Sequence, residues 1–143
     1  MWSWEEQFPE RVCRAVDGNC FRRAEQARAI MEAFGDLDTP MWATEFGWIV
    51  RPPACCLARQ DWSGRVWQAV SERNQARYLV DAIRYAEGNW PWMEVMFVWN
   101  LDYSRYPGSL DEACPYCNSM GWYSILDPDG SPRLAYEWLV AGP

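Results

Sequence analysis

The chain has 143 residues, a formal net charge of −7 and no histidine. A nucleic-acid partner is therefore not expected, because phosphate binding needs a basic face that this composition does not supply. The lack of histidine excludes Ser-His-Asp and Cys-His catalytic groups within the chain, and every zinc site that needs a histidine ligand. The 11 tryptophans and 7 tyrosines suit both core packing and the stacking of sugar rings.

A loop-like lead-in is predicted for residues 1–20, followed by a first helix over residues 21–34. Apolar side chains recur at helical spacing through that range, and Gly35 follows it as a stop signal. The start of the chain has neither the basic leader nor the apolar stretch of a signal peptide. No segment approaches the roughly 20 apolar residues of a membrane span, so no membrane association is expected.

The first predicted strand is the apolar run at residues 41–48, MWATEFGW, which contains the single acidic residue Glu45. A short run of this kind predicts a strand buried on both faces. Burying an ionised carboxylate is costly, so Glu45 is expected to be hydrogen-bonded at the open end of the strand or to take part in chemistry. A glutamate that caps a turn or pairs with an arginine is the alternative.

A second helix and a second strand follow a long loop. Residues 71–88 carry apolar side chains at helical spacing, with Ser71 as the predicted N-cap and Gly88 as the C-terminal stop. Residues 95–101 form another apolar run that is too uniformly hydrophobic for a half-exposed strand. Strand, helix and strand together predict a βαβ unit whose sheet is covered.

The end of the chain predicts a turn and a last helix. Residues 127–130 (DPDG) carry a turn signal, and Ser131 followed by a proline is predicted to cap the helix. An apolar stripe then extends from Leu134 to Leu139. The resulting order of helix, strand, helix, strand and helix is expected of an α/β fold.

Several of these segments resemble the C-terminal part of a retaining glycoside hydrolase, in the clan of (β/α)8 barrels that includes cellulases and β-xylosidases. The segments are residues 44–48 (TEFGW), the helix that begins near Ser71, the strand end at residues 98–101 (VWNL) and the closing turn at residues 127–133 (DPDGSPR). The resemblance covers roughly residues 21–140, and TEFGW is its most specific motif. It implies a partial (β/α)8 TIM barrel made of helix 6, strand 7, helix 7, strand 8 and helix 8, as one partial domain over residues 1–143.

The resemblance implies that Glu45 is the catalytic nucleophile and that Trp99 forms a sugar-stacking platform. Trp48 follows the first strand at the same mouth and is expected to line the sugar site as well. Thr44 and Asn100 are expected to position groups around the carboxylate. The substrate would be a β-linked glycan or glycoside, and the reaction calls for no cofactor and no metal.

A retaining glycosidase needs a second carboxyl group about 5–5.5 Å from the nucleophile. In the families that the chain resembles, the acid/base glutamate lies on the fourth strand, which has no counterpart here. Glu94 precedes the second strand and is expected at the wrong end of it. Asp102 is better placed, although a polar residue that leaves a strand is more often a loop anchor, and Asp111 and Glu112 lie in a long loop.

A complete barrel needs about 250 residues, so the chain is interpreted as a fragment or as one half that assembles with a separate first half. The isolated chain would then carry the nucleophile without the acid/base and show no appreciable turnover. Unpaired strand edges would favour self-association. The alternative is a noncatalytic α/β domain that binds carbohydrate or a partner chain through its aromatic mouth.

Six cysteines lie outside the predicted strands and core helices: Cys13, Cys20, Cys55, Cys56, Cys114 and Cys117. An even number confined to loops favours disulfides and an oxidising, extracellular compartment. Unpaired thiols and a zinc or redox site on the CxxC motif at residues 114–117 are the alternatives. Cys55 and Cys56 are adjacent in the sequence, and two adjacent residues are poorly placed to bind the same tetrahedral metal.

Overall fold

A computed structural model describes residues 21–103, 114 and 116–142. Its elements, in chain order, are helix α1 (Arg23–Ala33), strand β1 (Met41–Phe46), helix α2 (Ala54–Leu57), the 3-10 helices η1 (Gln60–Trp62) and η2 (Val66–Gln68), helix α3 (Glu72–Asn89), strand β2 (Met93–Val98), the 3-10 helix η3 (Ser119–Tyr123) and helix α4 (Leu134–Ala141). The predictions for the lead-in at residues 1–20 and for Cys13, Cys20, Asp111 and Glu112 concern residues outside this described part of the chain.

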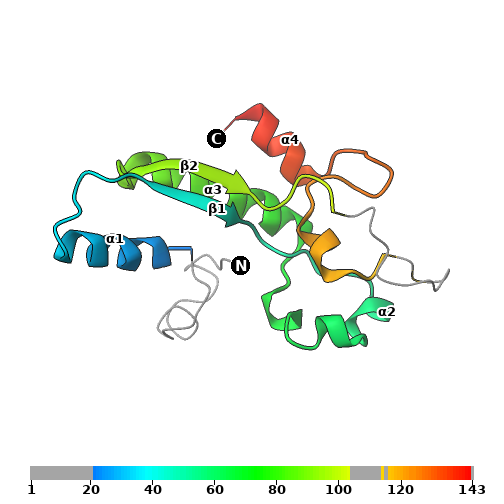
Figure 1. Cartoon of the computed structure of the whole chain (residues 1–143). Helices are drawn as coiled ribbons and strands as arrows, with labels where there is room; N and C mark the ends of the chain where they lie inside the picture. The colour runs from blue at the N-terminus through cyan, green and yellow to red at the C-terminus, as the bar shows by residue number, and fades with distance from the viewer. Residues whose placement is uncertain (1–20, 104–113, 115, 143) are drawn as a thin grey trace.

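The two strands pair in parallel, and α3 connects them (Figure 1). The pairing extends from Met41 opposite Met93 to Phe46 opposite Val98, with irregular register between Ala43 and Phe46. A parallel pair needs a crossover of a dozen or more residues, and the 18-residue α3 provides it. The predicted βαβ unit is therefore present.

The predicted partial (β/α)8 barrel is wrong. The described residues form one two-stranded sheet with four α-helices, which is too small for the last two strands and three helices of a barrel. Barrel strands are paired along both edges, whereas each strand here has one edge that no described residue pairs. The expectation that both strands are buried on both faces also fails, because Trp42 is 58% and Phe97 51% exposed.

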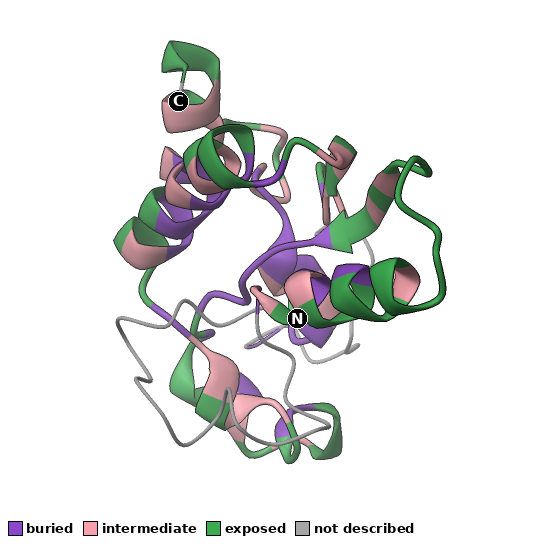
Figure 2. Cartoon of the chain, turned by 90° about the vertical axis from the view of Figure 1, so that its left-hand side faces the viewer, coloured by how far each residue is buried: buried purple, intermediate pink, exposed green. Residues whose placement is uncertain are grey.

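Helix α3 forms where its sequence pattern predicts. The side chain of Ser71 accepts a hydrogen bond from the backbone N–H of Asn74, as an N-cap should. The apolar stripe faces inward, so Ala76, Leu79 and Ala82 are buried (Figure 2). The predicted stop at Gly88 is early by one residue, because the helix continues to Asn89.

The start of α4 differs from its prediction. The cap position is Arg133 and not Ser131, whose hydroxyl instead donates to Asp129 within the preceding turn. The first N–H of the helix, at Leu134, donates to the carboxylate of Glu72 at 3.1 Å. Because Glu72 begins α3, this contact joins the amino ends of the two helices and adds a favourable charge to the α4 dipole.

The main core lies between the sheet, α1, α3 and α4, and large aromatic side chains dominate it. Trp48 is 2% exposed and packs against Tyr78, with ring centroids 5.5 Å apart. Phe21 stacks on Trp90 at 4.8 Å. Each such ring contributes about 2–3 kcal/mol through burial, which is how one pair of strands is held in place. No described helix is long and apolar enough to cross a membrane.

Glu25 joins α1 to the end of α3. Its Oε1 atom accepts hydrogen bonds from Arg22 at 2.9 Å, from the Tyr85 hydroxyl at 3.0 Å and from the Trp90 indole at 3.0 Å. Partial burial raises the pKa of this carboxyl, but the three donors outweigh it and bring the pKa below its usual value of 4.5. The ionised form is therefore the one that the fold stabilises.

Gly47 lies where the backbone of Trp99 crosses the end of β1. The N–H of Trp99 donates to the carbonyl of Phe46 at 2.7 Å. A Cβ atom at position 47 would lie 2.3 Å from the carbonyl oxygen of Trp99, closer than real Cβ atoms approach any neighbour. Glycine is required here by the close approach of two backbones.

Replacing Gly47 by alanine is expected to lower the free energy of unfolding by about 1–3 kcal/mol, because the added methyl group must push the Trp99 backbone away. Urea denaturation measures the loss. Gly88→Ala is the matched control: nothing lies within 4 Å of its Cβ position, and alanine in a helix stabilises by about 0.5–1 kcal/mol. Equal stability of Gly47→Ala and the wild type would contradict the close approach.

Acidification should weaken the fold partly through Glu25. A carboxyl whose pKa is lowered by folding contributes stability that is complete above its unfolded value of 4.5 and is lost as the pH falls through its folded value. Glu25→Gln should therefore lower the free energy of unfolding by about 1 kcal/mol at neutral pH, a figure reduced for solvent screening. The variant should also lose less stability than the wild type as the pH falls. Urea unfolding from pH 7 downward tests this, with the exposed Glu87→Gln as control. Parallel curves for wild type and Glu25→Gln would refute it.

The isolated chain is expected to self-associate through the outer face of its sheet. Trp42 and Phe97 lie there side by side, with ring centroids 6.5 Å apart, next to unpaired strand edges. Light scattering over a range of concentrations should show oligomers that the double change Trp42→Ser and Phe97→Ser weakens. Trp67→Ser, which removes a ring that is 53% exposed on η2, should leave association unchanged. A wild-type monomer at all concentrations would argue against the surface.

Candidate functional site

A pocket of about 260 Å³ lies at the carboxyl ends of the two strands. Its lining residues come from β1 and the turn after it, from the loop before η2, from the end of β2 and from η3: Glu45, Phe46, Gly47, Arg65, Trp99, Met120 and Tyr123. Ligand sites of open parallel sheets occur at this end of the strands. The pocket is therefore the first candidate for a functional site.

Glu45 is the next-to-last residue of β1, and its exposed side chain lines the pocket. The prediction that it lies in a buried run is wrong. A two-stranded sheet does not cover both faces of β1, so the carboxylate keeps contact with water. Its charge needs no buried counter-ion, which removes the premise that burial makes Glu45 reactive.

Trp99 follows β2 directly and lines the same pocket as Glu45. Its side chain is half-buried, and its ring lies 6.2 Å from that of Tyr103. The hydrogen bond to the carbonyl of Phe46 fixes its backbone against the end of β1. The strand ends thus bring together the predicted nucleophile and the predicted sugar platform.

The other three predicted site residues lie elsewhere or act indirectly. Trp48 is a core residue, and its ring packs on Phe21 and Tyr78 away from the pocket lining. Thr44 is exposed on β1 and is not among the lining residues. Asn100 is buried, and its side-chain amide donates to the carbonyl of Met120 at 3.2 Å. Asn100 therefore supports the pocket wall.

The wall formed by η3 is held by buried side-chain amides. Asn100 accepts a hydrogen bond from the Ser124 hydroxyl at 2.7 Å, immediately after η3. Gln75, on α3, is fully buried and donates to the carbonyls of Tyr123 at 3.3 Å and Trp48 at 2.9 Å. The two Gln75 bonds satisfy backbone carbonyls of irregular segments outside the sheet and the α-helices.

Two disulfides, Cys55–Cys114 and Cys56–Cys117, join α2 to the segment before η3. They confirm the prediction of disulfides for these four cysteines, and they indicate an oxidising environment. The first bridge closes a loop of 59 residues, which stabilises the fold by about 4 kcal/mol in the chain-entropy model. The second closes almost the same loop, so it adds much less.

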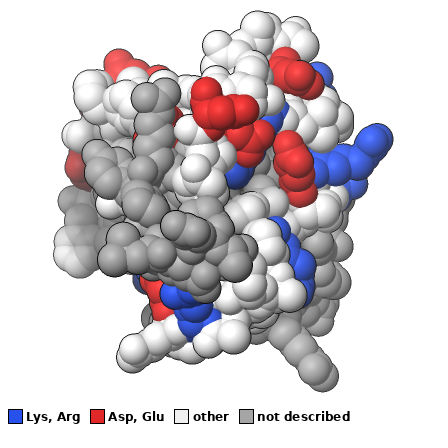
Figure 3. Space-filling model, turned by 90° about the vertical axis from the view of Figure 1, so that its right-hand side faces the viewer, with Lys and Arg blue, Asp and Glu red and all other residues white. Residues whose placement is uncertain are grey.

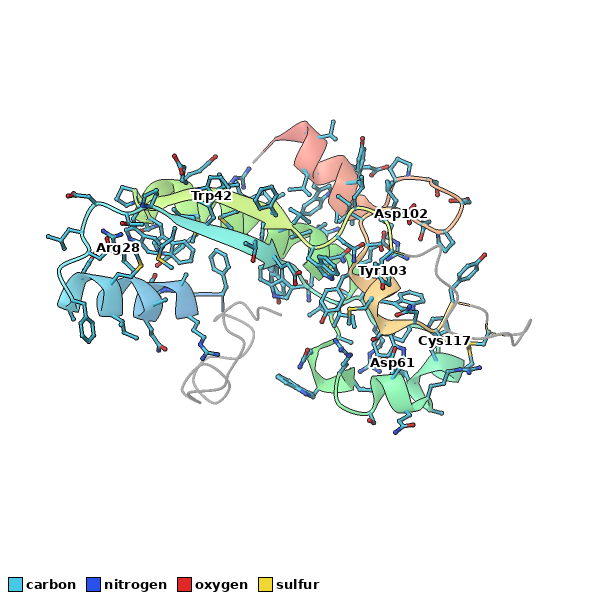
Figure 4. All side chains as sticks on the ribbon, viewed as in Figure 1. Arg28, Trp42, Asp61, Asp102, Tyr103 and Cys117 are labelled. Atoms are coloured by element: carbon cyan, nitrogen blue, oxygen red, sulfur yellow. A yellow bond between two sulfur atoms is a disulfide. The ribbon has the colours of Figure 1, made fainter. Side chains whose placement is uncertain are left out.

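A second hydrophobic cluster surrounds the bridges and reaches the pocket through Tyr123. Trp62 on η1 is fully buried in it and donates to the carbonyl of Cys117 at 2.9 Å. Asp61 accepts from the N–H of Ser119 at 2.6 Å, and Figure 4 shows Asp61 and Cys117 in the lower part of the molecule beside α2. The pocket wall is therefore anchored to α2 and η1 as well as to the sheet.

The described pocket lining contains a tyrosine and two oppositely charged side chains. Burial raises the pKa of Tyr123 to about 12, although the neighbouring Arg65 guanidinium opposes the shift. Tyr123 is protonated at neutral pH like any tyrosine, and its raised pKa extends the protonated form to higher pH. Arg65 supplies the positive charge of the lining and Glu45 the negative one.

Glu45 is the one carboxylate among the described residues that line the pocket. Asp102 is half-buried beyond the end of β2 and is not part of that lining (Figure 4). Glu94 lies at the other end of the sheet, where it accepts a hydrogen bond from the indole of Trp42 at 2.6 Å. Neither alternative acid/base group is brought to Glu45 by the described structure.

Arg65, Met120 and Tyr123 are pocket residues that the sequence did not single out. They come from a loop and a 3-10 helix, whose residues follow no periodic pattern. The spacing of the cysteines was the available signal, because bridges between residues 55–56 and 114–117 bring these two segments together.

On the face in Figure 3, acidic side chains gather beside basic ones.

No protein-family model matches the chain, and neither does any curated protein or solved structure. The candidate site therefore depends on its own geometry for a functional interpretation.

Proposed function

We propose that the pocket is the sugar-binding half of a retaining glycoside hydrolase site, with the Glu45 carboxylate as nucleophile. The observation that carries the proposal is that Glu45 and Trp99 line one pocket at the carboxyl ends of two parallel strands. A flat ring binds the apolar face of a sugar, and a carboxylate beside it is the group that attacks an anomeric carbon.

The size of the pocket fits one sugar ring. Sites for small molecules usually enclose about 300–1,000 Å³, and this pocket is slightly smaller, at about 260 Å³. Tyr123 would form part of the wall against the sugar, with its hydroxyl buried. The N–H groups of Arg65 would donate hydrogen bonds to the remaining hydroxyl oxygens of the sugar.

In the proposed step, an oxygen of Glu45 bonds to the anomeric carbon while the bond from that carbon to the leaving oxygen breaks. The leaving oxygen takes a proton from an acid, and water later releases the sugar from Glu45. Because Glu45 is the one carboxylate in the described lining, we propose that a partner chain supplies the acid/base. The disulfides support an extracellular site of action.

The second candidate is a noncatalytic carbohydrate-binding domain, and the exposure of Glu45 favours it. In that case the carboxylate accepts hydrogen bonds from sugar hydroxyls and forms no covalent bond. The two candidates differ in whether Glu45 becomes glycosylated, so a reagent that needs no acid catalyst distinguishes them.

A panel of dinitrophenyl 2-deoxy-2-fluoro-β-glycosides provides that reagent, because dinitrophenolate leaves without a proton. We expect the isolated chain to release about one equivalent of dinitrophenolate and then stop, since the fluorine slows release of the sugar. Peptide mass spectrometry should find the sugar on Glu45. Trp99→Ala should slow the labelling and weaken saccharide binding.

Glu45→Gln should abolish the adduct, and Glu94→Gln, which changes a carboxylate at the other end of the sheet, should not. Saccharide binding by calorimetry without any adduct would replace the first candidate by the second. Neither binding nor labelling with any member of the panel would overturn both.

A further inference from the structure

Four cysteine sulfurs lie close together at the hydrophobic cluster that also contains Tyr123 of the pocket wall. The Sγ atoms of Cys55, Cys56, Cys114 and Cys117 all lie within 4.8 Å of one another. In addition to the two bonded pairs, the Sγ of Cys114 lies 3.2 Å from that of Cys56 and 3.1 Å from that of Cys117. The bridges are thus adjacent to each other and form one compact cluster.

The cluster is compact enough for its four sulfurs to surround a tetrahedral metal once the bridges are reduced. Zinc binds thiolate sulfur at about 2.3 Å, which places the four sulfurs of a tetrahedral site about 3.8 Å apart. Cys55 and Cys56 on α2 and Cys114 and Cys117 before η3 bring all four sulfurs to the same place. The adjacency of Cys55 and Cys56 in the sequence therefore does not keep their sulfurs apart from those of Cys114 and Cys117.

We propose that, when reduced, the four-cysteine cluster binds one Zn²⁺ ion as a tetrathiolate. Two dithiol molecules reduce the two disulfides to four thiols, and each dithiol is oxidised to its own disulfide. Zn²⁺ then displaces four protons, one from each thiol. The cluster has two closed states, disulfide-bonded in oxidising and zinc-bound in reducing surroundings, and each holds α2 against the segment before η3.

The burial of the cluster gives reduction an order. Cys55 is exposed, whereas the other three cysteines are buried. A dithiol reduces the Cys55–Cys114 bridge first and leaves Cys114 as a thiolate 3.1 Å from the Cys117 sulfur. That thiolate attacks Cys117, forms a Cys114–Cys117 bond and releases Cys56, after which the second dithiol reduces the new bond.

Metal binding is tested on the full chain, reduced with a dithiol and freed of it by gel filtration without oxygen. Titration with Co²⁺ should give the visible bands of a tetrahedral cobalt thiolate at one ion per chain, and Zn²⁺ should remove them. Native mass spectrometry should find one zinc in the reduced chain and none in the oxidised chain.

Cys55→Ser is the informative variant, because Cys55 is exposed and its loss leaves the buried packing intact. It should weaken zinc binding by more than about 100-fold, the loss seen when a group that only supports a ligand is removed. The double change Cys13→Ser and Cys20→Ser is the control and should bind as tightly as the wild type.

Three results would overturn the proposal: no cobalt bands in the reduced wild type, unchanged affinity in Cys55→Ser, or loss of binding in the Cys13 and Cys20 control. Circular dichroism of each reduced variant, recorded with and without zinc, establishes whether it is folded. If Cys55→Ser is unfolded, Cys55→Ala and Cys117→Ser are titrated with Co²⁺ instead, and wild-type affinity in either variant would equally refute the site.

Discussion

The contact between the backbones of Gly47 and Trp99 is the constraint on which the site depends. The hydrogen bond from Trp99 to Phe46 joins the chain after β2 to the end of β1, just where regular pairing stops. The absence of a side chain at Gly47 lets the two backbones meet. Glu45 and Trp99 therefore share a pocket because the backbone of Trp99 contacts Phe46 and Gly47, which directly follow Glu45.

The opposite wall of the pocket is irregular and depends on interactions from several elements. Asn100 and Gln75 bind its carbonyl groups through buried amides, and the bridge from Cys56 to Cys117 ties it to α2. Buried polar groups of this kind specify one arrangement when all of their partners are present. The wall is thus positioned from the sheet, from α3 and from α2, each through different chemistry.

Local patterns in the sequence predicted the elements, and long-range contacts decided the rest. The α3 range and its Ser71 cap follow from spacing and capping chemistry within one segment. The apolar runs of β1 and β2 predicted strands correctly, but they do not say what covers a strand. Trp42 and Phe97 are exposed because they lie on a face of the sheet that the described elements leave open to solvent, and this is where the barrel prediction failed. The pairing of Glu45 with Trp99 was predictable because parallel strands end at one edge, whereas Arg65 and Tyr123 come from segments without periodicity.

The two bridges also determine what happens when the polypeptide is cut. Both span nearly the same stretch, from residues 55–56 to residues 114 and 117, and α3 and β2 lie inside it. Proteolytic nicking anywhere between residues 57 and 113 yields two peptides that remain covalently tethered. Glu45 then belongs to one peptide and Tyr123 to the other, so both parts of the pocket stay linked in a nicked molecule as long as the bridges are intact.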